Sequence, residues 1–222
     1  MSKRAPPRVI AFEEGATPVP VARPPKLARS VFHVASALLA LALIRVLPGR
    51  VWLAATAGAF ALAAWTMEIA RRRSSRANTW LMRMFGPVAH DHERHRTNSS
   101  TWYVTALALL AAFAPLRGAE LGVLVLGIAD PAAGLVGRRF GRTRLRADRS
   151  LEGSLAFFVT GFGVSFAWLV ATGDGASSAA WLAAIAGLTG AVTELAAGRR
   201  FDDNFVVPVS IAAVVGVWLT QR

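Results

Sequence analysis

The chain of 222 residues contains no cysteine, which excludes disulfide frameworks and thiol chemistry. Acidic residues are also scarce, because 13 Asp and Glu stand against 25 Lys and Arg, and the formal net charge is +12. Hydrophobic residues nevertheless make up 54% of the chain. A soluble domain of this length has a single core, which cannot take up so much apolar surface. The composition therefore indicates a membrane protein whose apolar segments face lipid.

Seven apolar runs follow one another along the chain, at 31–47, 51–70, 101–115, 121–136, 154–171, 179–197 and 205–220. Most of them approach the roughly 17–25 residues that a helix needs to cross the hydrocarbon core of a bilayer. We therefore expect an all-α membrane protein with about seven transmembrane helices. Residues 1–27 are rich in proline and charge and carry no cleavable signal pattern. We expect a flexible cytosolic arm there and a transmembrane domain at 28–222.

The basic residues predict an orientation in the membrane. Of the 25 Lys and Arg, 21 lie in the N-terminal arm or in the connections after the second, fourth and sixth apolar runs, and 4 lie on the other side. Because cytoplasmic loops carry the excess of positive charge, this distribution predicts a cytoplasmic N-terminus and an external C-terminus. We expect an integral membrane protein, located in the plasma or inner membrane if the source is bacterial.

Most carboxylates fall on the same predicted side as the arginines. Asp130 lies about two turns before the predicted end of the fourth span, Glu194 lies near the end of the sixth, and Asp202 and Asp203 follow it. An intramembrane carboxylate is costly unless it is paired, bound to a metal or open to water, so Asp130 and Glu194 are functional candidates. Mg²⁺ prefers oxygen ligands and arginine forks bind phosphate oxygens, so the two groups together favour a metal–phosphate site.

Glycines follow Asp130 at helical spacing. Asp130, Gly134, Gly137 and Gly141 are four, three and four residues apart, which places them on one face if the helix continues. Such a stripe is typical of close packing between membrane helices. Alternatively, glycines around GRRFG expose backbone N–H groups to phosphate, although the Lys-Ser/Thr ending of the Walker motif is absent. The spacing leaves both interpretations open.

The stretch DPAAGLVGRRFGRTRL, with RSLEGS after it, resembles the signature of the CTP-dependent lipid kinases. This is the family of dolichol kinase, phytol kinase and CTP-dependent diacylglycerol kinase. The positions that match its signature are Asp130, Ala133, Gly137, Gly141, Glu152, Gly153 and Ser154. Three further family motifs recur in order, through Arg29 with His33, through Glu93, and through Asp202, Asp203, Asn204 and Pro208. Ser30, His90, Ala129 and Arg149 depart from the family pattern, which has lysine, arginine, glycine and lysine there.

The resemblance implies an enzyme that transfers the γ-phosphoryl group of CTP to the hydroxyl of a lipid alcohol at the cytoplasmic face, with Mg²⁺ as cofactor. It implies that the metal is held by Asp130, Asp202 and Asp203. The implied nucleotide-binding residues are Gly137, Arg138, Arg139, Gly141, Arg142, Arg149, Glu152, Gly153 and Asn204. Asp130 is the first catalytic candidate, and His33, Glu93 and Glu194 are candidate proton acceptors. The expected partners are CTP, the lipid alcohol and membrane lipids, with no nucleic acid; the identity of the alcohol (diacylglycerol, a polyprenol or another isoprenoid alcohol) and the oligomeric state stay open.

Three alternatives compete with the lipid kinase interpretation of the sequence. A phosphatidate cytidylyltransferase-like enzyme would also use CTP and Mg²⁺ but would release pyrophosphate; the S/T-x-E-G element and the D-D-N turn favour the kinase. A transporter or scaffold predicts carboxylates spread across the depth of the bilayer, whereas these cluster on one side. Finally, HDHERH suggests a zinc site at His90, His92 and His95. Six adjacent residues cannot all point at one ion, so we expect a solvated segment there.

Overall fold

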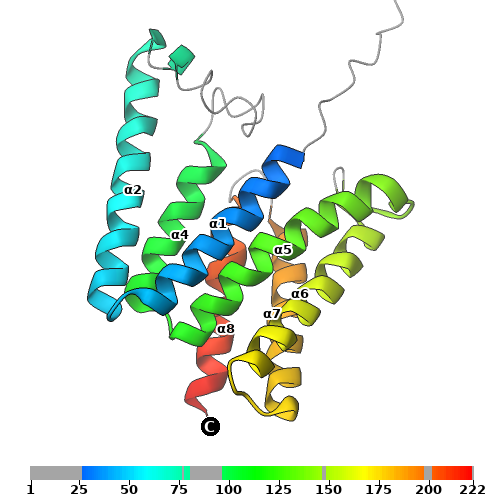
Figure 1. Ribbon diagram of the computed structural model, residues 1–222. Helices are drawn as coiled ribbons and strands as arrows, with labels where there is room; N and C mark the ends of the chain where they lie inside the picture. The colour runs from blue at the N-terminus through cyan, green and yellow to red at the C-terminus, as the bar shows by residue number, and fades with distance from the viewer. Residues whose placement is uncertain (1–26, 77, 81–96, 147–148, 198–201, 222) are drawn as a thin grey trace, which may run out of the picture.

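The computed structural model describes residues 27–76, 78–80, 97–146, 149–197 and 202–221. This part of the chain forms a bundle of long helices (Figure 1). The helices are α1 (Leu27–Val46), α2 (Arg50–Arg73), α4 (Ser99–Phe113), α5 (Leu116–Phe140), α6 (Leu151–Ala171), α7 (Ala176–Ala196) and α8 (Asp203–Thr220). Each of the seven predicted apolar runs is helical. The N-terminal arm, Glu93 and the HDHERH segment lie outside the described residues.

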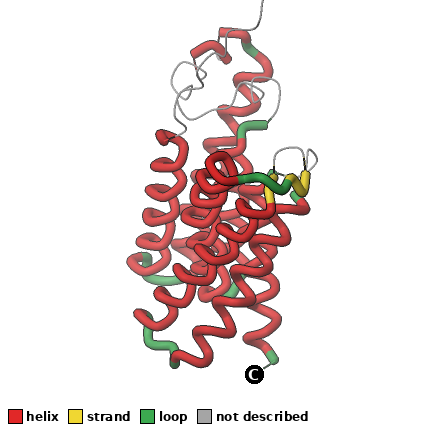
Figure 2. Tube along the Cα trace, turned by 90° about the vertical axis from the view of Figure 1, so that its right-hand side faces the viewer, coloured by secondary structure: helices red, strands yellow, loops and turns green. Residues whose placement is uncertain are grey.

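Successive helices run in alternate directions, so their connections gather at two ends of the bundle (Figures 1 and 2). At one end, Arg50 at the start of α2 donates hydrogen bonds to the carbonyl oxygens of Ala112 and Ala114 at the end of α4, at 3.1 and 2.8 Å. At the opposite end, Ser99 at the start of α4 contacts Asp202 just before α8. This second end carries Arg71–Arg73, Arg138–Arg146 and Arg149, and is called the arginine-rich end below.

The outside of the bundle is apolar over much of its length. Large side chains such as Val51, Leu62 and Val159 are 80%, 70% and 64% exposed. Five helices, α2, α5, α6, α7 and α8, are long and apolar enough to cross a membrane, while the apolar segments Ser30–Val46 and Ser99–Phe113 are shorter. The chain therefore has the character of an integral membrane protein, whose exposed apolar surface is matched to lipid. The count of seven spans and the orientation stay predictions.

Helix α5 lies at the centre of the fold and packs against α1, α6 and α8. Glycines make these approaches possible. A Cβ atom at Gly122 would lie 2.6 Å from the carbonyl oxygen of Pro208 in α8, and one at Gly127 would lie 2.2 Å from the Cβ of Ala37 in α1. The packing stripe expected of membrane helices is thus present along α5.

The structure corrects two details of the predicted fold. Helix α5 does not end at residue 136 but continues to Phe140, so Asp130 lies nearly three turns before its end. Arg138 and Arg139 occupy the last turn, where cations favour the negative end of the helix dipole. In addition, the described residues are not entirely helical, because β1 (Arg144–Arg146) and β2 (Arg149–Ser150) form a small antiparallel hairpin before α6.

Candidate active site

Arg149 joins three elements at the arginine-rich end. It lies in β2, directly before α6, and its guanidinium group forms ion pairs with Glu194 of α7 and Asp203 of α8. The second pair measures 2.9 Å between Nη2 and Oδ2. Glu194 is 2% exposed, and its Oε2 atom has no hydrogen-bond partner within the described structure. The sequence predicted these three residues for one site, and the fold brings them into direct contact.

The Asp202–Asn204 turn at the start of α8 consists of the N-cap residue Asp202 and the first two helical residues, Asp203 and Asn204. Asp202 caps the helix, since its Oδ1 accepts hydrogen bonds from the backbone N–H of Asn204 at 3.0 Å and from its side chain at 2.8 Å. Its Oδ2 accepts a hydrogen bond from the hydroxyl of Ser99 at 2.8 Å. Burial, and next the charge of Asp203, raise the pKa of Asp202 above its usual range, while the bonds from Ser99 and Asn204 oppose this in part.

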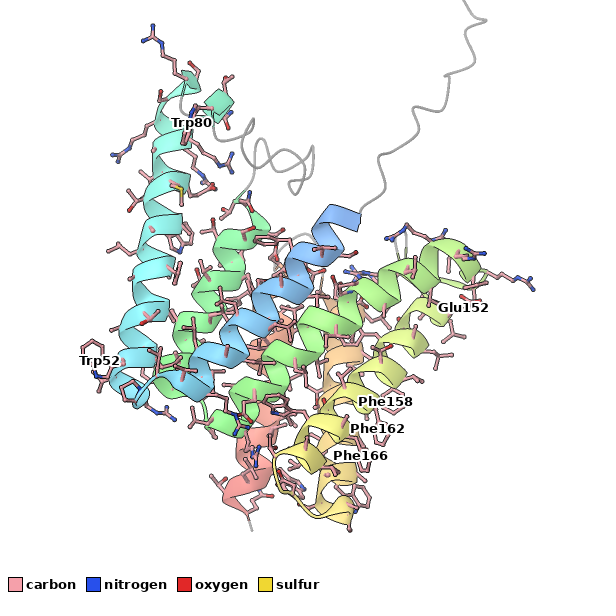
Figure 3. All side chains as sticks on the ribbon, viewed as in Figure 1. Trp52, Trp80, Glu152, Phe158, Phe162 and Phe166 are labelled. Carbon is pink, nitrogen blue, oxygen red and sulfur yellow. The ribbon has the colours of Figure 1, made fainter. Side chains whose placement is uncertain are left out.

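The hairpin is fastened to the helix ends around it. The backbone N–H of Thr143 donates to the carboxylate of Glu152, at 3.2 Å to Oε1, and Glu152 lies at the arginine-rich start of α6 (Figure 3). Arg146 donates to the carbonyl oxygens of Leu195 and Ala196 at 2.9 and 3.1 Å, which supplies partners to the open end of α7. Glu152 therefore holds the loop that presents Arg149.

The glycines of the signature are packing positions. A Cβ atom at Gly137 would lie 3.2 Å from Ser150 Oγ, and one at Gly153 would lie 3.4 Å from Gly137 Cα. Their backbone N–H groups are engaged: Gly137 lies inside α5, Gly141 donates to the carbonyl of Gly137 at 3.2 Å, and Gly153 donates to Ser150 Oγ at 3.2 Å. The structure therefore favours the packing interpretation over the one in which GRRFG exposes N–H groups to phosphate. The close α5–α6 approach is what these glycines provide.

Three predicted phosphate-binding arginines, Arg138, Arg139 and Arg142, extend from the end of α5 and are exposed. Arg138 folds back over Gly134, where a Cβ atom would lie 3.1 Å from its Nη1. Arg139 lies over the ring of Phe140, with 5.6 Å between Cζ and the ring centroid. Among the described residues, neither Arg138 nor Arg142 forms an ion pair, so both charges are open to an anionic ligand.

Asp130 and His33 lie half-buried on α5 and α1. In the antiparallel packing of α5 on α8, Gly118 lies against Ala212 and Gly122 against Pro208. Continued in steps of four residues, this register brings Leu126 opposite Asn204, so Asp130 lies about one helical turn beyond the level at which α8 begins. No group of three His, Asp or Glu side chains arranged to hold a metal occurs among the residues that the structure describes. The joint metal role of Asp130, Asp202 and Asp203 stays a prediction.

A second buried ion-pair cluster, which has no role among the predictions from sequence, lies at the arginine-rich end. Glu68 of α2 is 2% exposed and pairs with Arg71 and Arg72 at 2.8 and 2.7 Å. Arg72 also donates to the hydroxyl of Thr97 at 2.6 Å, just before α4. The spacing of Glu68, Arg71 and Arg72 is the helical i, i+3 and i+4 pattern, which was the available signal. This cluster fixes the end of α2 to the start of α4, which carries Ser99.

The opposite end has its own charge network. Glu120, which is 3% exposed, pairs with Arg45 at 2.8 Å and with Arg117 at 3.3 Å, and accepts a hydrogen bond from Trp168 at 3.1 Å. Arg117 also pairs with Asp174 at 2.9 Å. The exposed Trp52 and Trp80 lie at opposite ends of the bundle (Figure 3), as is common for tryptophans near the two membrane interfaces. Trp168 instead belongs to this network.

The fold and the site define an integral membrane protein of helices, with carboxylates and arginines gathered at one end. Two curated proteins are similar to the chain. CTP-dependent diacylglycerol kinase 1 of Schizosaccharomyces pombe is 30% identical over 143 residues, which is 60% of this chain and 66% of that protein. Dolichol kinase of Saccharomyces cerevisiae is 42% identical over 48 residues, which is 21% of this chain and 9% of that protein. No family model and no solved structure matches the chain.

These relatives confirm the resemblance to the CTP-dependent lipid kinase family. The match spans slightly less than two thirds of the S. pombe protein and a small part of the S. cerevisiae protein. Activity, substrate and phosphoryl donor therefore need an argument from this chain's own residues.

Proposed function

We propose that this protein transfers the γ-phosphoryl group of CTP to the hydroxyl group of a lipid alcohol, at the arginine-rich end and on the cytoplasmic side of the membrane. The observation that carries the proposal is Arg149, which draws Glu194 and Asp203 together beside the exposed Arg138 and Arg142. Phosphoryl transfer needs positioning and charge neutralisation more than covalent help from the protein. A site made of arginines and carboxylates is suited to both tasks.

The Asp202–Asn204 turn fits a magnesium ion. Mg²⁺ is usually bound in nucleotide sites by one or two carboxylates together with substrate phosphates, and Asp202 and Asp203 present two adjacent carboxylates. Burial, and next the charge of Asp203, raise the pKa of Asp202, and a bound cation would favour the ionised carboxylate against both. Asp202 and Asp203 would hold the ion, with Asp130 as a third candidate carboxylate about one helical turn away along the bundle. When bound, the ion supplies neutralisation of phosphate charge.

The protein's own residues have separate roles in this proposal. Arg138, Arg139 and Arg142 bind the triphosphate, and Asn204 and Glu152 hold the surrounding loop and helix start. Arg149 compensates the charge of the buried Glu194 carboxylate. The free Oε2 of Glu194 then accepts the proton of the alcohol. The alcohol oxygen forms a bond to the γ-phosphorus, the bond to the β-phosphate oxygen breaks, and CDP leaves with that electron pair.

Gly137, Gly141 and Gly153 serve this site by bringing α5 and α6 together. Ser150 fills the space between them and also caps α6 through its bond to the N–H of Gly153. The residue before it, Arg149, is therefore held at a fixed height relative to the end of α5. In this proposal the glycines position the nucleotide-binding arginines and do not touch the nucleotide through N–H groups.

The function is tested with purified protein in detergent, Mg²⁺ and CTP labelled in the γ-phosphate. The acceptors are dioctanoylglycerol, farnesol, phytol and a polyprenol, each supplied separately. We expect labelled lipid phosphate with at least one alcohol, and a strong loss of label transfer with EDTA or with γ-labelled ATP in place of CTP. Equal turnover with ATP would contradict the assignment of CTP, and no labelled lipid with any alcohol would contradict the kinase assignment.

A further inference from the structure

Tyr103 lies one helical turn from the proposed metal-binding turn, on the apolar side of it. Ser99 and Tyr103 are four residues apart in α4, so they lie on one face of that helix. Ser99 donates its hydrogen bond to Asp202, which places the Asp202 carboxylate at the first turn of α4. Tyr103 follows one turn deeper in the bundle, where it belongs to the same apolar cluster as Leu126 of α5 and Val207 of α8.

The hydroxyl of Tyr103 is buried without a hydrogen-bond partner in the described structure, and the residue is 8% exposed. The Ser36 hydroxyl of α1, which donates to the carbonyl of His33 at 3.0 Å, lies close to it but outside hydrogen-bonding geometry. A buried hydroxyl that has lost its water contacts and gained no partner destabilises the fold. Such a group in a native protein calls for an explanation, and an absent ligand is one.

We propose that the Tyr103 hydroxyl binds the hydroxyl oxygen of the acceptor lipid alcohol, beside Ser36. The inference rests on the proposed kinase function and adds a residue that recognises the acceptor. The nucleotide comes from the water at the arginine-rich end, whereas the lipid hydroxyl comes from the apolar side, and Tyr103 lies between the two. The Tyr103 O–H donates a hydrogen bond to a lone pair of the alcohol oxygen. The alcohol's own O–H is then left to donate its proton to the proposed base, Glu194.

The position of Tyr103 sets it apart from the other buried hydroxyl groups without partners. Ser165 is 0% exposed and its hydroxyl is equally unpartnered in the described structure. It lies in the second half of α6, away from the arginine-rich end at which α6 begins. Ser165→Ala removes an unpartnered hydroxyl far from the proposed site, so it is the matched control for Tyr103→Phe.

The test compares wild type, Tyr103→Phe and Ser165→Ala in the phosphorylation assay with dioctanoylglycerol and with farnesol. For Tyr103→Phe we expect about a tenfold lower kcat/KM for the alcohol, as for the loss of one hydrogen bond. The KM for CTP stays at the wild-type value, and the melting temperature equals or exceeds that of wild type, because removing a buried hydroxyl without a partner costs the protein no hydrogen bond. Ser165→Ala matches wild type in kcat/KM, and its melting temperature likewise equals or exceeds that of wild type. Wild-type kinetics in Tyr103→Phe, or a melting temperature that falls as its activity falls, would overturn the inference.

A binding measurement separates this inference from the proposed function. Without CTP, the alcohol should raise the melting temperature of wild type more than its acetate ester does, since the ester lacks the hydroxyl. Tyr103→Phe should respond alike to both. This pattern in a wild type that transfers no phosphate would uphold the alcohol site and reject the kinase assignment. Equal responses to alcohol and ester in an active wild type would reject the alcohol site alone.

Discussion

At the scale of single residues, the guanidinium group of Arg149 joins distant parts of the sequence, because it pairs with side chains from two helices, α7 and α8. Its partner Glu194 is buried, and a buried carboxylate is tolerable only while its charge is compensated. The family pattern has lysine at this position. A lysine ammonium is a point charge, whereas the planar fork of arginine directs two N–H groups to two carboxylates at once.

Replacing Arg149 by methionine should destabilise the protein, since Glu194 would then be buried without its cation. We expect a loss of about 3 kcal/mol, the lower part of the range for breaking a buried pair, because Arg149 itself is partly exposed. The double variant Arg149→Met, Glu194→Gln should recover most of that stability and stay inactive. Thermal unfolding in one detergent measures the first effect and label transfer the second. A single variant as stable as wild type would contradict the buried pairing.

Asp130→Asn tests the carboxylate inside α5. The variant keeps the shape and removes the charge, so we expect turnover to fall by about 100-fold or more if this charge serves the transferring phosphoryl group. Folding should survive, because neutralising an intramembrane carboxylate lowers its desolvation cost. Asp174→Asn, at the opposite end, is the control and should keep its turnover. Full activity in Asp130→Asn would remove Asp130 from the site, and a collapsed melting temperature would make it a structural residue.

The raised pKa of Asp202 predicts a pH effect on stability. A carboxyl whose pKa is higher in the folded protein favours folding while it is protonated, and that contribution is lost as the pH rises through the folded value. Asp202→Asn stays neutral at all pH values. In EDTA, the melting temperature of the variant minus that of wild type should therefore grow as the pH rises from acid to neutral. A difference that shrinks over this range would show that burial does not raise the pKa.

At the scale of the helices and their connections, the close approach of α5 and α6 decides where the arginines lie. Gly141 ends α5, and a Cβ atom there would lie 2.2 Å from the carbonyl oxygen of Gly137 and 2.6 Å from Ser150 Oγ. Gly134 belongs to the same stripe but has only the flexible end of Arg138 nearby. Substitutions at Gly141 and Gly134 therefore compare a tightly packed position with a loosely packed one in the same stripe.

Gly141→Ala should lower stability by about 1–3 kcal/mol, the range for overpacking, and should lower activity because Ser150 and Arg149 move together. The identical change at Gly134 should leave stability unchanged or raise it slightly, since alanine is the better helix former. Unfolding in one detergent and label transfer are the measurements. If Gly141→Ala were as stable as Gly134→Ala, the packing role of Gly141 would be wrong.

The sequence predicted the helices better than the contacts between them. Apolar runs of membrane length give a strong signal, so all seven helical segments were predicted. The basic residues in the connections predicted which connections lie at the same end of the bundle. The end of α5 was missed because Arg138 and Arg139 look like a loop, although a last helical turn accepts cations. The hairpin was missed because its two strands are too short to show a pattern.

The site was predicted in part for a similar reason. Motif spacing identified Arg149, Glu194 and Asp203, but their mutual contacts depend on how α6, α7 and α8 pack, which no local pattern contains. Ser99 and Glu68 carried weak signals, since a serine before a helix and an acid before arginines are common. Glu93, which the family pattern singles out, lies outside the described residues.

At the scale of the whole molecule, alternate helix directions collect the arginines, the Asp202–Asn204 turn and Glu194 at one end. The positive-inside rule then predicts that this end faces the cytoplasm, with the N-terminus inside and the C-terminus outside. A reporter fused after Arg222 should be active only on the external side, and one fused at the N-terminus only inside. A cytoplasmic reporter after Arg222 would contradict this orientation.

The central claim is that the γ-phosphoryl group, and not the cytidylyl group, passes from CTP to a lipid alcohol. CTP that carries ³²P in the γ-phosphate and tritium in the cytosine ring tests it in parallel reactions with the best acceptor alcohol and with phosphatidate, the acceptor of the rival cytidylyltransferase. The account predicts ³²P in the lipid product and tritium in CDP, in equal amounts, with neither product formed by Asp203→Asn. Tritium in the lipid with ³²P released as pyrophosphate would contradict it and assign the protein to the cytidylyltransferases instead.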